Sequence, residues 1–152
     1  RGVLAATAIA AAPGVQRLVF GSIDFALDLD LSGDPAGFDL AAGLLALASR
    51  SAGIASPVAG VTTSLDDEAL LRSDVARARC HGFGAKLCIH PRQVAWLHDA
   101  LRPPEAELAW ARRVLAASDA LGTPAGAVQV DGRMVDKPVI ERARRLLLRA
   151  AG

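Results

Sequence analysis

The chain has 152 residues, of which 52% are apolar, so it can bury the core of one ordinary domain or form part of a larger one. A net charge of +1, aromatic residues at 4% and the lack of tyrosine argue against a nucleic-acid partner, because neither a basic field nor a base-stacking surface is available. Cys80 and Cys88 show no CxxC spacing, and no apolar run approaches the roughly 18 residues of a membrane span. We therefore expect a cytoplasmic protein without disulfides or a membrane partner.

Helices and strands alternate along the first part of the sequence. Residues 2–12 predict an alanine-rich helix that a Pro-Gly pair closes. Residues 17–21 (RLVFG) are a short apolar run bounded by glycine, which is typical of a buried strand. A polar loop is expected next, and residues 38–52 predict a helix that ends at Gly53.

The same alternation continues to about residue 101. Residues 54–61 predict a strand that Pro57 weakens, and Ser64 is the expected N-cap of a helix that runs to about residue 81. Residues 85–89 predict a further strand, and Pro91 opens the next helix. The strands are continuously apolar rather than alternating, which indicates parallel strands covered by helices, as in a doubly wound sheet or a (β/α)8 barrel.

The alternation of helices and strands ends after the Pro-Pro pair at 103–104. Residues 105–121 predict a long helix, residues 127–136 a hairpin turned by Asp131 and Gly132, and an arginine-rich helix follows. This tail is not another strand–helix repeat. The expected division is therefore an α/β portion, residues 1–102, and a helix–hairpin–helix extension, residues 103–152.

Asp24 is a candidate metal ligand. In parallel α/β folds ligands bind at the carboxyl ends of the strands, and Asp24 closely follows Gly21, which ends the predicted strand. Mg²⁺ is held in many proteins by one or two carboxylates together with water and substrate oxygens. On the residues alone a second interpretation stays open, in which Asp24 caps the following loop or faces solvent.

A zinc site is not expected from the cysteines and histidines of the chain. Cys80, His81, Cys88 and His90 match no zinc-finger spacing, so the cysteines are interpreted as small apolar residues. His90 stands between a strand and a helix-opening proline. There it could orient a ligand or bond the turn, and the sequence leaves both open.

Four segments in order resemble the citrate lyase beta subunit-like proteins of the HpcH/HpaI aldolase family of CoA-ester lyases. They are FGSIDF (20–25), PVAGVTT (57–63), GFGAKLCIHP (82–91) and VDGRMVDKPVI (130–140). The resemblance covers essentially the whole chain and implies a phosphoenolpyruvate/pyruvate-type (β/α)8 TIM barrel with a C-terminal helical extension. On this mapping the predicted strands are barrel strands six, seven and eight, so the chain is the C-terminal portion of the barrel.

The resemblance also implies a chemistry. Family members make or break a carbon–carbon bond next to a carbonyl with Mg²⁺, pairing a CoA or acyl-carrier thioester, such as citryl- or malyl-CoA, with a 2-oxo acid. Asp24 matches the family's metal-binding aspartate, and a glutamate at the end of strand five is its partner. Gly21 and Ser22 lie in the same motif and are expected at the substrate.

Further residues are implied at the rim and across subunits. Asp136 matches an acid/base aspartate that in relatives reaches a neighbouring protomer's site, which implies a homo-oligomer and specifically a homotrimer. As an alternative or in addition, Asp136 is an N-cap for the last helix. Lys86, His90 and Pro91 are expected on the CoA side of the rim.

The sequence departs from the family pattern in three ways. It begins at Arg1, directly after the place of the strand-five glutamate, so that ligand, the oxo-acid-binding arginine and the first four strands are expected to be missing. Position 59 is alanine where many relatives have an acidic residue, and Asp30 stands where they often have glycine. Half a barrel leaves open sheet edges, so we expect the chain to need the N-terminal half of the barrel, or self-association, and to be inactive as a lyase alone.

Two other functions stay open at this level. One is a non-catalytic assembly or acyl-CoA-binding module derived from the same fold. The other is a barrel enzyme that acts on a free 2-oxo acid, which the long tail disfavours because that tail resembles the CoA-lyase branch.

Overall fold

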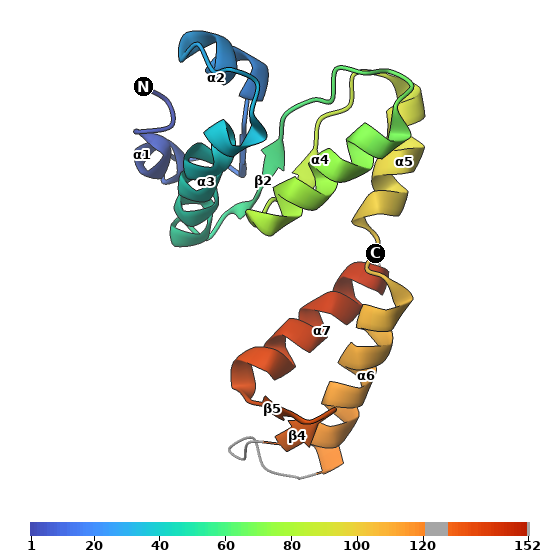
Figure 1. The fold of residues 1–152 in the computed structure, drawn as a ribbon. Coiled ribbons are helices and arrows are strands. Elements are labelled where there is room, and N and C mark those ends of the chain that lie inside the picture. Colours follow the sequence, from blue (N-terminus) through green and yellow to red (C-terminus); the bar gives the residue numbers. More distant parts are fainter. Residues whose placement is uncertain (121–127, 152) are drawn as a thin grey trace. The chain divides into compact units, whose positions relative to one another are not determined.

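The computed structural model describes residues 1–120 and 128–151, which form two compact units (Figure 1). The first unit spans Arg1–Leu101 and the second Arg102–Gly152, and each is described by itself. Within the described residues no helix is both long and apolar enough to cross a membrane.

A three-stranded parallel sheet organises the first unit. Its strands are β1 (Arg17–Val19), β2 (Ala55–Ala59) and β3 (Ala85–Lys86), in the order β1-β2-β3. Pro57 lies in the central strand, where a residue without an N–H is unusual. The pairing of β1 with β2 is irregular at this point, since Arg17 pairs with Ala55 and Val19 with Val58. This irregularity accommodates the missing donor, and the carbonyl of Pro57 still accepts a hydrogen bond from the backbone N–H of Gly84, at 3.2 Å.

Helices pack around this sheet (Figure 1). They are α1 (Ala6–Ala10), α2 (Ser22–Asp28), a 3-10 turn η1 (Pro35–Phe38), α3 (Asp39–Ser51), α4 (Glu68–Cys80) and α5 (Pro91–Leu101). Leu18 and Phe20 face a core with α1 and α3, to which Leu45 contributes. Leu71 and Leu97 form a second core between α4 and α5. The alternation of helix and strand predicted for this part of the chain is confirmed, with three corrections.

The first correction concerns the loop predicted after residue 21, which contains α2. Its half-buried aromatic side chain packs on other rings, whereas Ile23 and Leu27 stay exposed: the Phe25 ring lies 5.3 Å from that of Phe20 and 6.3 Å from that of Phe38. Three aspartates within 24–30 made the segment look like a loop. Before β1, the helix expected over residues 2–12 is regular only at Ala6–Ala10 and is preceded by turns.

The second correction concerns the start of α4. The expected N-cap, Ser64, is not the cap; Asp67 is, because its backbone is extended and its carboxylate accepts a hydrogen bond from the N–H of Leu70 at 2.9 Å.

The third correction is the length of β3, which was expected to run to residue 89. Leu87 still donates its N–H to Ala59 O at 3.0 Å. Ile89 donates instead to the Oε1 atom of Gln93, at 2.9 Å, so the ladder stops before the predicted end.

Asp30 adopts a left-handed backbone conformation, with φ of 52°. Glycine favours this region because it has no Cβ, whereas aspartate visits it at a modest cost. A glycine at this position would avoid that cost.

The second unit is a helix–hairpin–helix. It contains α6 (Glu105–Ala120), β4 (Val128–Val130), β5 (Arg133–Val135) and α7 (Lys137–Ala151). Asp131 and Gly132 both have positive φ, 51° and 75°, as a two-residue type I′ turn requires, which confirms the predicted hairpin. Val114 and Leu146 belong to the core between α6, α7 and the hairpin. The predicted element ends at residues 121 and 127 lie outside the described residues.

Candidate active site

The turn between β1 and α2 carries the candidate metal ligand. Phe20 donates its N–H to Val58 O at 3.0 Å, and α2 begins two residues later. Asp24 is exposed in the first turn of α2. Its Oδ2 atom lies over Gly21, where an added Cβ would stand only 3.2 Å away. Glycine at this position therefore lets the Asp24 carboxylate sit directly above the backbone at the carboxyl end of β1.

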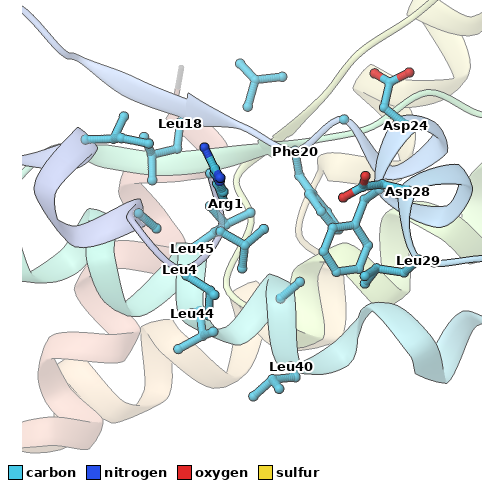
Figure 2. A pocket seen from close by; sticks show the side chains of 18 of the residues that line it. Arg1, Leu4, Leu18, Phe20, Asp24, Asp28, Leu29, Leu40, Leu44 and Leu45 are labelled. Atoms are coloured by element: carbon cyan, nitrogen blue, oxygen red, sulfur yellow. The ribbon is translucent and has the colours of Figure 1, made fainter.

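An apolar pocket of about 1170 Å³ lies beside this turn. Figure 2 shows leucines of α3, Leu40 and Leu44 among them, on one side of it and the acidic side chains of α2 on another. Asp24 and Asp28 are one helical turn apart on α2 and are both lining residues. The pocket thus places an exposed carboxylate at the edge of a surface that is otherwise mostly hydrocarbon.

The Asp24 carboxylate fits one side of a Mg²⁺ site. Among residues 1–120 and 128–151 no cluster of three His, Cys, Asp or Glu side chains is arranged to hold a metal ion. A carboxylate such as that of Asp24 nevertheless matches the hard oxygen donors that Mg²⁺ prefers, and this ion commonly takes only one or two carboxylates from the protein. Asp24 is therefore suited to be one ligand of a site completed by other oxygens.

The end of β2 is packed tightly against this turn. Gly60 is buried, and a Cβ added there would overlap the hydroxyl of Ser22 and approach Phe20 O to 3.0 Å. The hydroxyl of Ser22, expected at the substrate, thus lies against the backbone of Gly60. At Gly84 an added Cβ would likewise overlap the Ser56 hydroxyl.

Lys86 is buried rather than displayed on the rim. Its side chain is 4% exposed; its Nζ donates a hydrogen bond to Gly60 O at 2.7 Å and lies 3.7 Å from Asp74 Oδ2. Burial lowers the pKa of Lys86, while the carboxylate of Asp74 acts in the opposite direction. In this structure the ammonium points to two protein groups.

Three further polar residues join Lys86 in a network that the sequence analysis missed. Thr62 donates its hydroxyl proton to Asp74, and the fully buried Gln93 donates from Nε2 to Thr62 O at 3.0 Å and to Ser64 O at 2.9 Å. These contacts tie the segment after β2 to the start of α5. One signal could have indicated Gln93: it stands in the first turn of a proline-opened helix, where a polar side chain can bond nearby backbone groups.

His90 and Pro91 form the turn into α5. His90 Nδ1 accepts a hydrogen bond from the N–H of Arg92 at 3.2 Å, and His90 O accepts one from Gln93 N at 3.0 Å. The turn-bonding interpretation of His90 is therefore realised, with Nδ1 unprotonated in this arrangement. Cys88 packs against the core between α4 and α5, and burial raises the pKa of its thiol.

Asp136 caps α7 in the second unit. Its Oδ1 accepts a hydrogen bond from Val139 N at 3.3 Å, and its backbone carbonyl accepts one from Ile140 N at 3.0 Å. The N-cap interpretation is thus confirmed. Asp136 is also exposed, so the cap does not close it off from a further partner.

A family model described as "HpcH/HpaI aldolase/citrate lyase" matches residues 1–91. The "Citrate lyase subunit beta-like protein" of Deinococcus radiodurans is 40% identical over 149 residues, which cover 96% of this chain and 52% of the relative. A "(3S)-malyl-CoA thioesterase" of Cereibacter sphaeroides is 35% identical over 153 residues, covering 99% of this chain and 53% of the relative. The chain thus spans about half the length of the curated relatives that it matches.

A solved structure shares the fold of the chain. The crystal structure of the protein CitE from Mycobacterium tuberculosis, in complex with magnesium, acetoacetate and coenzyme A, superposes with a TM-score of 0.88 at 32% identity. The match covers 100% of this chain and 58% of that one.

Proposed function

The chain belongs to the HpcH/HpaI aldolase/citrate lyase family, and from that premise we propose that it forms the C-terminal part of a magnesium-dependent carbon–carbon lyase acting on a CoA thioester. The observation that carries the proposal is the position of Asp24, exposed on the first turn after β1 at the rim of an apolar pocket. Magnesium and coenzyme A bound to the similar Mycobacterium tuberculosis protein support it.

Asp24 would hold Mg²⁺ in this proposal. When bound, the ion acts as a Lewis acid that polarises carbonyl oxygens and stabilises the negative charge that develops on them. Asp24 contributes one carboxylate, and Gly21 leaves room above the backbone for that carboxylate and for a ligand. The apolar side chains that line the pocket lower the local dielectric constant on one side of the carboxylate, which strengthens electrostatic interactions there.

The remaining expected residues take supporting roles. Asp136 is proposed as an acid/base group for a neighbouring protomer in a homotrimer, since capping α7 holds its carboxylate in one place. His90 and Pro91 shape the rim by which the thioester enters, with His90 fixed by its bond to Arg92. The oxo-acid half of the reaction and a cytoplasmic setting belong to the same proposal.

A complementary half of the barrel is part of the proposal. Strands β1 and β3 lie at the two edges of the three-stranded sheet. Apolar side chains next to the β1 edge are strongly exposed, Leu4 at 89% and Leu27 at 83% among them. Unpaired strand edges and apolar patches of this kind call for a covering partner. The missing N-terminal half of the barrel is the proposed cover, and the end of its strand five is the proposed source of the second carboxylate.

An assay of product identity tests the proposal. The chain would be mixed with the part of the Deinococcus radiodurans relative that lies outside the matched region, given Mg²⁺ and malyl-CoA or citryl-CoA, and its CoA products separated by chromatography. A lyase releases acetyl-CoA and a 2-oxo acid, whereas a thioesterase releases free CoA and an intact acid. We expect lyase products that disappear in Asp24→Asn. Asp28→Asn, one turn along α2, is the matched control and should retain activity.

A non-catalytic acyl-CoA-binding module is the second candidate. The lack of a three-residue metal cluster around Asp24 among the described residues favours it over a self-sufficient enzyme. If the mixed proteins bind CoA but release neither product, while a family enzyme of full length is active in parallel, the module takes precedence over the lyase.

A further inference from the structure

Lys86 is buried at the end of β3 with its ammonium fixed between two groups. Its Nζ lies 2.7 Å from Gly60 O and 3.7 Å from Asp74 Oδ2, and its side chain is 4% exposed. A buried ammonium is tolerated only where hydrogen bonds and opposite charge replace its hydration. Because one partner is a strand-end carbonyl and the other belongs to α4, the lysine fixes the end of β2 relative to that helix.

The other side of Gly60 contacts the turn that bears Asp24. An added Cβ would overlap the Ser22 hydroxyl, stand 3.2 Å from Ser22 Cβ and come within 3.0 Å of Phe20 O. Gly60 is therefore held between the ammonium on its carbonyl and the β1–α2 turn on its α-carbon. A movement of the Gly60 peptide therefore displaces Ser22, because no free space separates these close-packed atoms.

Ser22 and Asp24 belong to one rigid turn. Ser22 N donates to Phe20 O and Phe25 N donates to Gly21 O, each at 3.0 Å, so the backbone on both sides of Asp24 is bonded. The Asp24 carboxylate rests over Gly21 at the start of that turn. A shift of Ser22 therefore moves the carboxylate with it.

From these contacts we infer that Lys86 is a positioning residue, which fixes the Asp24-bearing turn through the peptide of Gly60. The inference rests on the proposed role of Asp24 as a metal ligand. It assigns to Lys86 an indirect role, distinct from the CoA contact expected from the sequence. In this structure the Lys86 ammonium is buried, whereas a contact with the phosphates of CoA would require it to be exposed to solvent.

The neighbouring polar network explains how the lysine itself is held. Asp74, which faces Lys86, also accepts the hydroxyl proton of Thr62, and Gln93 bonds Thr62 O. These groups come from the segment after β2, from α4 and from α5, so hydrogen bonds through Asp74 and Thr62 link three parts of the unit to the lysine. β3 does not pair with β1, and the contact through Gly60 bridges the strand between them.

Amide hydrogen exchange in the 152-residue chain tests the inference without a metal. Lys86→Met keeps an unbranched apolar stem but removes the donor to Gly60 O. We expect exchange of the Ser22 and Phe25 amides to accelerate at least tenfold relative to amides of the second unit. Lys137→Met is the matched control: it removes the chain's other lysine, which is exposed at the start of α7, and should leave both amides unchanged.

A Mn²⁺ titration gives a readout that a merely structural lysine would not move. We expect Lys86→Met to raise the Mn²⁺ concentration needed to broaden the amide signals around Asp24 at least threefold, with the urea midpoint of the unit little changed. Unchanged exchange at Ser22 and Phe25 would overturn the inference. If the wild-type chain shows no Mn²⁺ broadening there, the metal-ligand proposal fails while the exchange result still decides the positioning role. Should Lys86→Met not fold, Gly60→Ala perturbs the same turn from the other side, and unaltered signals at residues 21–25 in that variant would also refute the inference.

Discussion

Gly60→Ala should destabilise the first unit, and the contacts at Gly60 set the size of the effect. The new methyl group would overlap the Ser22 hydroxyl, which could rotate away, but Phe20 O at 3.0 Å is backbone and Ser22 Cβ at 3.2 Å cannot rotate. Overpacking of this kind costs about 1–3 kcal/mol. The backbone of Gly60 is not in the left-handed region, so alanine also reduces the entropy of the unfolded chain by about 0.4–1 kcal/mol in the opposite direction. A net loss of roughly 1–2 kcal/mol follows.

Gly84→Ala is the matched comparison. Its added Cβ would meet only the Ser56 side chain, whose hydroxyl can turn to another rotamer, and the next contact, Ser56 Cβ, is at an ordinary 3.4 Å. We therefore expect a change within about 1 kcal/mol of zero, because the favourable unfolded-state effect offsets a small rotamer cost. The difference is that backbone blocks the methyl group of Gly60→Ala, whereas only a rotatable side chain blocks that of Gly84→Ala.

Urea unfolding followed by the fluorescence of one tryptophan measures both variants. Trp96 belongs to the first unit and Trp110 to the second, so a Trp110→Phe background makes the signal report the first unit alone. With slopes of about 1–3 kcal/mol per M, Gly60→Ala should lower the midpoint by roughly 0.5–1 M. Equal midpoints for the Gly60 and Gly84 variants would refute the packing argument. Adding Ser22→Gly to Gly60→Ala should recover only part of the loss, since Phe20 O remains in place.

Three further outcomes follow from charge and burial. Cys80 is exposed, whereas burial raises the pKa of Cys88, so mass-mapped alkylation of the native chain should modify Cys80 first; equal rates would contradict the packing of Cys88. Burial lowers the pKa of Lys86 in the folded state below its unfolded value of about 10.4. Between these two pKa values the unfolded state binds more protons, so the free energy of unfolding should rise with pH. Lys86→Met should flatten this rise in the urea midpoints, and a rise of the same size in the variant would refute the burial argument. Hydrogen bonding to Arg77 lowers the pKa of Asp39 in the folded state. The Asp39 carboxylate should therefore stabilise the fold above about pH 3.9, and this stabilisation should be lost as the pH falls through the folded-state pKa. Asp39→Asn should lose that pH dependence, and an unchanged acid unfolding curve would contradict the pairing of Asp39 with Arg77.

The elements with strong local signals could be predicted from the sequence. The hairpin at Asp131 and Gly132 follows from a turn that needs positive φ at two positions, and Pro91 marks the start of α5 because proline is favoured in the first turn. The misassigned elements depend on tertiary contacts. Helix α2 is stabilised by the packing of Phe25 on Phe20, which directly follows β1, and on Phe38 at the end of η1, and no local pattern records the contact with Phe38.

Only part of the candidate site could be predicted, because some of its contacts join residues that are far apart in the sequence. Asp24 stands out in the sequence because it closely follows a strand-end glycine, but on the residues alone a loop cap or a solvent-facing side chain is an equally open interpretation, and the resemblance is what indicates a metal ligand. The burial of Lys86 could not be predicted, since its partners, Gly60 and Asp74, are 26 and 12 residues away along the chain. Gln93 was overlooked because its two acceptors, at 62 and 64, come from another element.

Binding of the metal ion by Asp24 is the central property of the proposed site. The measurement is paramagnetic broadening of backbone amide signals during a Mn²⁺ titration of the 152-residue chain, Asp24→Asn and Asp28→Asn. Broadening centred on the amides of residues 21–25 that is lost in Asp24→Asn and retained in Asp28→Asn is the predicted result. Equal broadening in the wild type and in Asp24→Asn, or broadening centred on other acidic residues, would contradict the placement of the metal at this strand end.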